Sequence, residues 1–190
     1  MGSTGVLAVQ GDFTEHVHVL RRLGQPCREV RLPEDLGKVD ALIIPGGEST
    51  TIGKLSDRFG LTEAIRERTL AGMPLWGTCA GMIFMAKDLG AHRQSMLQLM
   101  DITVERNAFG AQLDSFETDL PISVFDDGLF HAVFIRAPVI ESVGASVDVL
   151  SKLKDGRIVA AEQDNLLATA FHPELTDDPR FHEYFVDKIG

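Results

Sequence analysis

A cysteine between two glycines is the first place where residue type and spacing predict chemistry. In PLWGTCAGMIFMAK (residues 74–87), Cys79 lies in the pattern Gly-x-Cys-x-Gly, between a strand-like apolar run and a helix-like one. A sharp strand-to-helix turn of this kind presents a nucleophile at the edge of a sheet. The start of the helix stabilises a thiolate, and we expect the N–H of Ala80 to face an oxyanion. A buried structural cysteine beside a glycine turn fits these five residues equally well.

A base and a carboxylate to orient it are found together near residue 172. In AFHPEL (residues 170–175), His172 and Glu174 are two apart, so an extended chain points both side chains the same way. The carboxylate then holds one imidazole nitrogen, fixes the tautomer and leaves the other nitrogen for a thiol. We predict no metal site, and we expect the other five histidines to be surface or packing residues: His16, His18, His92, His131 and His182.

The glycine-rich stretch IIPGGESTTIGKL (residues 43–55) has some features of a phosphate-binding loop. Its spacing is wrong for one, because five residues rather than four separate the glycines and no Ser or Thr follows the lysine. We instead expect the pair Gly46-Gly47 to bring backbone N–H groups close to a ligand. Ser49 or Thr50 is then expected to cap the helix that follows.

Strands and helices alternate in the first half of the chain and position these segments. Apolar runs predict strands in TGVLAVQ, CREVRL, DALIIPGG and PLWGT, and helical spacing predicts helices in DFTEHVHVLRRLG, LTEAIRERTLAG and AGMIFMAKDLG. Asp12 and Glu15 resemble a capping box. This alternation predicts a parallel sheet with helices on both faces, which binds ligands at the carboxyl ends of its strands. PGGEST, GTCAG and FHPE all fall at such ends.

The second half predicts mainly strands: DITVERNAFG, SFETDL, HAVFIRAP, ASVDVLSKL, GRIVAAEQ and LLATAFHPE. The turn signals KDGR and QDNL indicate antiparallel hairpins. A closing helix is expected in DDPRFHEYFVDKIG, capped by Asp178, with Pro179 first and with Phe181, Phe185 and Ile189 on one face. The predicted fold class is α/β: a single domain over residues 1–190, with a mostly parallel central sheet flanked by helices and an antiparallel excursion.

Composition narrows the functional classes. The net charge of −10 argues against a nucleic-acid or anionic-membrane surface, and no apolar run approaches the ~20 residues that cross a bilayer. The N-terminal stretch lacks the pattern of a secretion signal. Two cysteines, Cys27 and Cys79, make no disulfide framework, so we expect reduced thiols in a cytoplasmic protein, with Cys27 a small core residue.

Six blocks in order along the chain carry a family resemblance: GVLAVQGDFTEHVHVL, PGGESTTIGKL, GTCAGM, DITVERNAFG, FIRAPVI and ATAFHPELTDD. The chain resembles the triad class of glutamine amidotransferases, also called class I, which has a flavodoxin-like fold. Within this class it is most similar to the glutaminase subunits of pyridoxal 5'-phosphate synthases. Gln98, in MLQLMDI, stands where this resemblance leads us to expect a glycine.

The resemblance implies a reaction and a set of site residues. L-Glutamine would be hydrolysed to glutamate and ammonia by the triad Cys79, His172 and Glu174. The ammonia would pass to a (β/α)8-barrel synthase subunit for pyridoxal phosphate (vitamin B6) synthesis, and this chain would need no cofactor. The backbone of Gly47 and Ala80 would form the oxyanion hole. The implied substrate contacts are Gly47, Glu48, Ser49, Arg106, Ile135 and Arg136, with Gln10 as an accessory residue.

Other readings of the same residues stay open. Without the resemblance, Arg106 and Arg136 are better explained as ordinary ion-pairing partners of an acidic surface. A cysteine protease or redox sensor on a similar sheet is a second functional class, although such proteins usually lack an adjacent His-x-Glu pair. A non-catalytic interaction module is a third, and the presence of all three triad residues argues against it.

Overall fold

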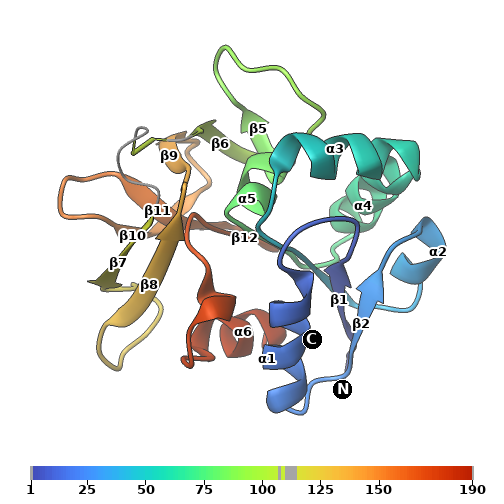
Figure 1. Cartoon of the computed structure of the whole chain (residues 1–190), viewed down its shortest axis with the longest axis horizontal. Coiled ribbons are helices and arrows are strands. Elements are labelled where there is room, and N and C mark those ends of the chain that lie inside the picture. The colour runs from blue at the N-terminus through green and yellow to red at the C-terminus, as the bar shows by residue number, and fades with distance from the viewer. Residues whose placement is uncertain (1, 107, 110–114, 190) are drawn as a thin grey trace.

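Five parallel strands form the centre of the molecule (Figure 1). The computed structural model describes residues 2–106, 108, 109 and 115–189. The order of the parallel strands across the sheet is β2 (Cys27–Val30), β1 (Thr4–Leu7), β3 (Ala41–Ile44), β4 (Leu75–Thr78) and β12 (Leu166–Thr169). Four of them are buried along their whole length, which explains why they read as continuous apolar runs rather than alternating ones.

Helices cover both faces of this parallel region. Helices α1 (Phe13–Arg22) and α6 (Arg180–Val186) lie on one side of the strands (Figure 1). Helices α3 (Ser49–Arg58), α4 (Leu61–Leu70) and α5 (Ala80–Met85) lie on the other, and the short α2 (Pro33–Leu36) packs against α4. The chain runs from β1 to β2 in one direction across the sheet and from β3 to β4 in the other. The strand order therefore reverses between β1 and β3, the kind of point at which open α/β sheets bind ligands.

Beyond β12 the sheet is mainly antiparallel, and among the described strands there only the outermost pair, β5 with β6, is parallel. Within the described residues, ten strands form one mixed sheet, in which β12 is followed by β11, β9, β6 and β5, and β10 pairs with the outer side of β11. These strands are β5 (Ala86–Asp88), β6 (Met100–Glu105), β9 (Val139–Val143), β10 (Asp148–Lys152) and β11 (Ile158–Gln163). A separate antiparallel pair consists of β7 (Ser115–Leu120) and β8 (Phe130–Ile135). The predicted fold class and the predicted hairpin turns between β10, β11 and β12 are confirmed.

A cluster of aromatic side chains ties α6 and the antiparallel region to the parallel sheet. The Trp76 ring of β4 lies 6.1 Å from Phe181 and 5.5 Å from Phe185, both on α6. Phe171, just after β12, contacts Phe181 and also Phe130 of β8. All five side chains are fully buried. The segment that carries His172 is therefore anchored in the core directly before the pocket.

Several local predictions are wrong at element ends. The helix after Cys79 stops at Met85 rather than continuing through residue 90, because residues 86–88 pair with β6 as a parallel strand. Asp12 occupies the N-cap position of α1 but makes no side-chain capping hydrogen bond, so there is no capping box. Helix α6 begins after Pro179 and ends at Val186, so Ile189 lies beyond it.

Some features lie outside the sequence-based predictions. Strands β5 and β9 and helix α2 were not expected. Asp178 accepts a hydrogen bond from the N–H of Arg180 at 3.1 Å, although the N-cap residue is Pro179. Cys27 is only partly buried, packed against the core from β2. Asn107 and Gly110 of the block DITVERNAFG lie outside the described residues. Across the described part of the chain, none of the helices has the length and apolar character that a membrane crossing requires.

Candidate active site

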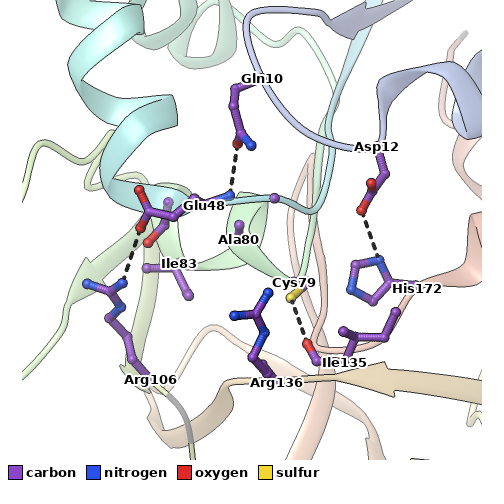
Figure 2. Close-up of a pocket in the computed structure, with 12 residues that line it drawn as sticks. Gln10, Asp12, Glu48, Cys79, Ala80, Ile83, Arg106, Ile135, Arg136 and His172 are labelled. Atoms are coloured by element: carbon purple, nitrogen blue, oxygen red, sulfur yellow. Dashed lines mark hydrogen bonds and ion pairs between the residues drawn. The ribbon is translucent and has the colours of Figure 1, made fainter. Parts of the chain in front are cut away.

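The carboxyl ends of β1, β3, β4 and β12 open into one pocket of about 510 Å³ (Figure 2). Ten of the eleven residues expected from the sequence line it, and the eleventh, Glu174, lies directly behind His172. Asp12 and Ile83 line it as well and were not expected. The full lining is Gln10, Asp12, Gly47, Glu48, Ser49, Cys79, Ala80, Ile83, Arg106, Ile135, Arg136 and His172.

Cys79 sits on a strained turn between β4 and α5. Its backbone has φ 48° and ψ −104°, a conformation that L-residues rarely adopt. The turn is held because the N–H of Cys79 donates to the carbonyl of Thr169 at 2.8 Å, while Sγ points to the carbonyl of Ile135 at 3.9 Å. A Cβ on Gly77 would lie 2.5 Å from the carbonyl carbon of Gly81, so this close turn requires glycine. The predicted sharp turn from strand to helix at Cys79 is therefore present.

Ala80 is the first residue of α5, so its N–H has no acceptor within the helix and is free to face a ligand. It lines the pocket beside Cys79 (Figure 2). If the sulfur attacked a carbonyl carbon, the resulting oxyanion would therefore lie close to a free backbone donor and to the positive end of the helix dipole.

His172 and Glu174 form a buried pair behind the sulfur. Nδ1 of His172 lies 2.7 Å from Oε1 of Glu174, and both residues are more than nine-tenths buried. This leaves Nε2 as the imidazole nitrogen for Cys79. Burial alone would lower the pKa of His172, but hydrogen bonds to Cys79 and Glu174 and their negative charges raise that pKa to about 10. The result is a thiol, a base and an orienting carboxylate, which nucleophilic acyl transfer requires.

Asp12 is a second carboxylate near the same imidazole. Its Oδ2 lies 3.8 Å from Nδ1 of His172, and its own N–H donates to the carbonyl of Gly46 at 3.0 Å. Asp12, His172 and Glu174 offer ligand atoms within 4.8 Å of one another. Because Nδ1 of His172 is already hydrogen-bonded to Glu174, the geometry fits a hydrogen-bonded group better than a metal centre. The sequence signal for Asp12 was its place just after β1.

The glycine pair after β3 makes room for the imidazole. A Cβ on Gly46 would clash with Cε1 of His172, and Gly47 has a positive φ of 151°. Next to the pair, the N–H of Glu48 donates to Oε1 of Gln10 at 2.8 Å (Figure 2). The side chain of Gln10 therefore holds the backbone directly after Gly47, at the β1–β3 switch point.

Glu48 caps helix α3, so the prediction that Ser49 or Thr50 would cap it is wrong. The Glu48 carboxylate accepts hydrogen bonds from the N–H groups of Thr50 at 3.1 Å and Thr51 at 2.7 Å. Burial is the largest single influence and would raise the pKa of Glu48, but these bonds and those from the two hydroxyls together outweigh it and lower that pKa to about 2. The pocket therefore carries a fixed negative charge.

Arg106 supplies the opposite charge from the antiparallel side of the pocket (Figure 2). Its guanidinium lies 3.4 Å from Oε1 of Glu48 and donates to Oε1 of Gln94 at 2.9 Å. The same Gln94 oxygen accepts from the hydroxyl of Ser49 at 3.2 Å. Gln94 was not expected from the sequence. Without the family resemblance, Arg106 was expected to pair with an acidic surface. It does form an ion pair, but its partner is Glu48, which lines the same pocket.

Ile135 and Arg136 complete the pocket at the end of β8. The carbonyl of Ile135 is the group that Sγ of Cys79 faces, and the Arg136 side chain extends toward the same sulfur (Figure 2). Arg136 has a positive φ of 43°, so this strand end is also a strained turn.

The chain matches the model of one known protein family over nearly its whole length. The model of the SNO glutamine amidotransferase family matches residues 6–190. The chain belongs to this family. The resemblance inferred from the six sequence blocks is therefore confirmed.

Individual relatives are similar to this chain over nearly their whole length. The chain is 60% identical over 187 residues to the pyridoxal 5'-phosphate synthase subunit PdxT of Herpetosiphon aurantiacus, covering 97% of this chain and 98% of the relative. The PdxT subunit of Roseiflexus castenholzii is 56% identical, with 97% and 99% covered. A crystal structure of a glutamine amidotransferase superposes with a TM-score of 0.93 at 50% identity, covering 98% of each chain. PurLQS from Thermotoga maritima, at 16% identity and a TM-score of 0.65, shares the fold.

Proposed function

We propose that this chain hydrolyses L-glutamine to L-glutamate and ammonia, and that the ammonia is used to make pyridoxal 5'-phosphate. One observation carries the proposal. Cys79 stands on a strained turn beside His172, whose Nδ1 is held by Glu174, in a pocket that also contains a carboxylate and a guanidinium. Membership of the glutamine amidotransferase family and the PdxT relatives support the same reaction. The active unit would be one glutaminase domain over residues 1–190, without a cofactor.

Acylation begins with Cys79 as the thiolate and His172 as the imidazolium. The raised pKa of His172 favours this ion pair. The sulfur attacks the side-chain amide carbon of glutamine, and the electron pair of the C=O bond moves to oxygen. Nε2 of His172 then gives its proton to the amide nitrogen, so that ammonia leaves as the C–N bond breaks and a thioester remains.

Deacylation uses the same groups in reverse. His172 is now neutral at Nε2 and removes a proton from water, which attacks the thioester carbon. The C–S bond breaks, the thiolate and imidazolium are restored, and the new carboxylic acid group loses its remaining proton to solvent as glutamate leaves. Glu174 stays on Nδ1 throughout, where it stabilises the imidazolium and keeps the ring in one orientation.

The two fixed charges of the pocket suit the amino-acid end of glutamine. Arg106 would bind the α-carboxylate through its planar fork, and Glu48 would bind the α-ammonium group. Ser49 and the main chain of Ile135 and Arg136 would add polar contacts around the substrate. Binding at this end positions the amide at the sulfur, which is how non-reacting parts of a substrate contribute to rate.

The oxyanion hole would combine the N–H groups of Ala80 and Gly47. The carbonyl of Gly46 is hydrogen-bonded to Asp12, and the next N–H, that of Glu48, is hydrogen-bonded to Gln10. Glycine turns its peptides at low steric cost, so the Gly46-Gly47 segment is suited to two states. Gln10 and Asp12 would set which state is populated, giving Gln10 an accessory role.

The partner would be the synthase subunit that consumes the ammonia, which we propose is a (β/α)8 barrel. It would bind the region from Gln10 to Val17 and favour the productive state of the Gly46-Gly47 segment, so that ammonia is released only where it is used. The acidic net charge of −10 supports a protein partner over nucleic acid or an anionic membrane, and we place the complex in the cytoplasm.

The test is ammonia release from L-glutamine, measured as kcat/KM for the chain alone and with the synthase subunit. We expect low activity alone and strong stimulation by the partner. No ammonia release under either condition would contradict the proposed reaction. Full activity alone, with no stimulation and no complex, would contradict the proposed control but leave the chemistry intact.

A further inference from the structure

A buried pair of histidines lies behind the triad, on the side away from the pocket. His16 of α1 and His182 of α6 are both fully buried, and Nδ1 of His16 lies 2.9 Å from Nε2 of His182. The other nitrogen of His16, Nε2, is 3.4 Å from Oε2 of Glu174 and 3.3 Å from Oγ1 of Thr78. His16 therefore touches the one carboxylate oxygen that His172 does not use.

The positions of the hydrogens follow from what each nitrogen faces. Burial lowers the pKa of His16 well below its usual value, and the proximity of His182 and His172 disfavours a further positive charge there. Burial and the charge of Arg22 lower the pKa of His182 to about 3, so both rings of the pair are neutral at neutral pH. A neutral imidazole carries one N–H and one lone pair. A lone pair of His16 facing the Glu174 carboxylate would be repelled, so the hydrogen of His16 belongs on Nε2.

His182 fits this assignment. With Nε2–H of His16 directed at Glu174, Nδ1 of His16 must accept a hydrogen bond, and His182 must donate it from Nε2. Nδ1 of His182 is then a lone pair. That atom has no hydrogen-bond partner among the described residues, which is cheaper for a bare lone pair than for a buried N–H group.

We propose that His16 is a positioning residue for the triad, donating from Nε2 to Oε2 of Glu174 and held in that tautomer by His182. The proposal rests on the proposed function and deepens it. Oε1 of Glu174 is hydrogen-bonded to His172, whereas Oε2 is buried and has no hydrogen-bond partner among the described residues. Nε2 of His16 lies 3.4 Å from this unpaired oxygen, so a small approach of the two groups would give each carboxylate oxygen one N–H. Burial raises the pKa of Glu174, and the hydrogen bond and charge of His172 oppose this rise. An N–H donated by His16 would favour the ionised carboxylate in the same way. An ionised and fixed Glu174 is what the imidazolium of His172 requires.

The surroundings of the group make His16 the decisive donor. Thr78 and Trp76 of β4 are the uncharged neighbours of the histidine pair, and both precede Cys79 on the same strand. His16 does not line the pocket, so its substitution leaves the substrate contacts in place. The titratable or charged side chains facing this group are His172 and Asp12 on the pocket side, His182 and Arg22 beside His16, and Glu15, His18 and Asp177 along the groove outside Glu174.

The test compares the full-length wild-type chain with His16→Leu, which removes the donor, and His16→Gln, whose amide N–H can replace Nε2–H. The control is His18→Leu, on the same helix but exposed. The readout is the rate of Cys79 alkylation by iodoacetamide across pH, a measure of thiolate that needs no turnover. Without the donor, the pKa of Glu174 rises, its charge is lost at higher pH, and it no longer supports the thiolate–imidazolium pair there.

We expect the acid limb of the alkylation profile to move up by about one pH unit in His16→Leu, the size of one lost hydrogen bond to a charged group. His16→Gln should stay within a few tenths of a unit of wild type, and His18→Leu should overlay it. With the synthase subunit present, kcat for glutamine should fall about tenfold in His16→Leu while KM stays constant. Packing alone would lower the melting temperature without moving the acid limb, and an unmoved limb in a folded variant overturns the proposal.

A measurement on the unmodified protein covers the case in which His16→Leu does not fold. Nitrogen-15 NMR of histidine-labelled wild type should show His16 as the neutral Nε2–H tautomer at pH 7. The Nδ1–H tautomer there would overturn the proposal. These outcomes are separate from the proposed function, which fails if the wild-type chain releases no ammonia from glutamine even with its partner, whatever the alkylation profile shows.

Discussion

The two sides of the pocket are built differently. On the parallel side, Cys79 and His172 are 7% and 3% exposed. Cys79 directly follows β4, His172 lies three residues after β12, and backbone hydrogen bonds fix them to β12 and β8, respectively. On the antiparallel side, Arg106 and Arg136 reach the pocket through long side chains from less buried strand ends. The difference suggests a division of labour, in which short fixed side chains perform the reaction and long ones hold the substrate.

This division has a physical basis. Bond-making groups need positions accurate to a fraction of an ångström, which a strained turn packed on a buried sheet supplies. A charged clamp tolerates more freedom, because a bidentate ion pair reforms after small movements. Substitutions of Cys79 and His172 should therefore lower kcat, whereas those of Arg106 and Arg136 should raise KM. The predictions below test this contrast, from the largest expected effect to the smallest.

Cys79→Ala should lower kcat for glutamine at least ~10⁴-fold, because it removes the attacking atom itself. The measurement is ammonia release with the synthase subunit present. Cys27→Ala is the matched control, since Cys27 is the other thiol and lies on β2, outside the pocket lining. A glutamine-like alkylating agent should label Cys79 and spare Cys27. If Cys79→Ala retained activity and the agent labelled Cys27, Cys79 would not be the nucleophile.

His172→Asn and Glu174→Gln should have unequal effects. His172→Asn removes the base and should reduce kcat about as much as Cys79→Ala. Glu174→Gln leaves the base but neither fixes its tautomer nor stabilises its charge, so we expect a loss of about 10²- to 10⁴-fold. In both variants KM should change little, because neither side chain is expected to hold the substrate. Wild-type turnover in His172→Asn would refute the triad.

Arg106→Gln should raise KM and lower kcat/KM about 10- to 100-fold, the cost of one charge-assisted contact to the α-carboxylate. Arg106→Lys should recover only part of this loss, because lysine keeps the charge without the planar fork. Arg28→Gln, at an exposed position on β2, is the control. Unchanged KM in Arg106→Gln would mean that other groups bind the carboxylate. If Arg106→Gln lowered only kcat, the proposed contrast between the two sides of the pocket would be wrong.

The same contrast separates what the sequence could predict. On the parallel side, the short apolar runs that end in GTCAG, PGGEST and FHPE predicted which segments would meet, and residues of all three line the pocket. The structure gives a steric reason for two glycines of these motifs, because a Cβ on Gly77 or Gly46 would clash with neighbouring atoms. What failed there were helix caps: Glu48 and not Ser49 caps α3, because capping depends on the local backbone rather than on residue type alone.

The antiparallel side was harder to predict from the residues alone. Strands β5 and β9 have only three and five residues, and β5 exists because β6 lies beside it. Gln94 was missed because nothing near it in sequence reveals that it meets Ser49 and Arg106, residues 45 and 12 positions away. Arg106 itself was placed in the site only by family resemblance. Contacts between distant segments decide this side, and a single sequence carries no local signal for them.

Gln98 offers the smallest effect and the sharpest test of that less constrained side. The resemblance led us to expect a glycine here, and the residue indeed adopts the left-handed conformation that glycine favours, with φ 53°. Gln98 is exposed, so its side chain contributes little packing to offset the backbone strain. Gln98→Gly should therefore stabilise the fold by at most ~1 kcal/mol, because relief of strain is partly cancelled by the greater freedom of glycine in the unfolded chain.

The measurement is thermal unfolding at one pH, where that gain corresponds to a rise in Tm of about 2–4 °C for a chain of this length. Gln98→Ala keeps the Cβ and hence the strain, so its Tm should stay close to wild type, and glutaminase activity should be unchanged in both variants. A lower Tm in Gln98→Gly would show that the Gln98 side chain contributes more than its exposure suggests. A change in KM would extend the substrate-holding side of the pocket to the segment before β6, which also carries Gln94.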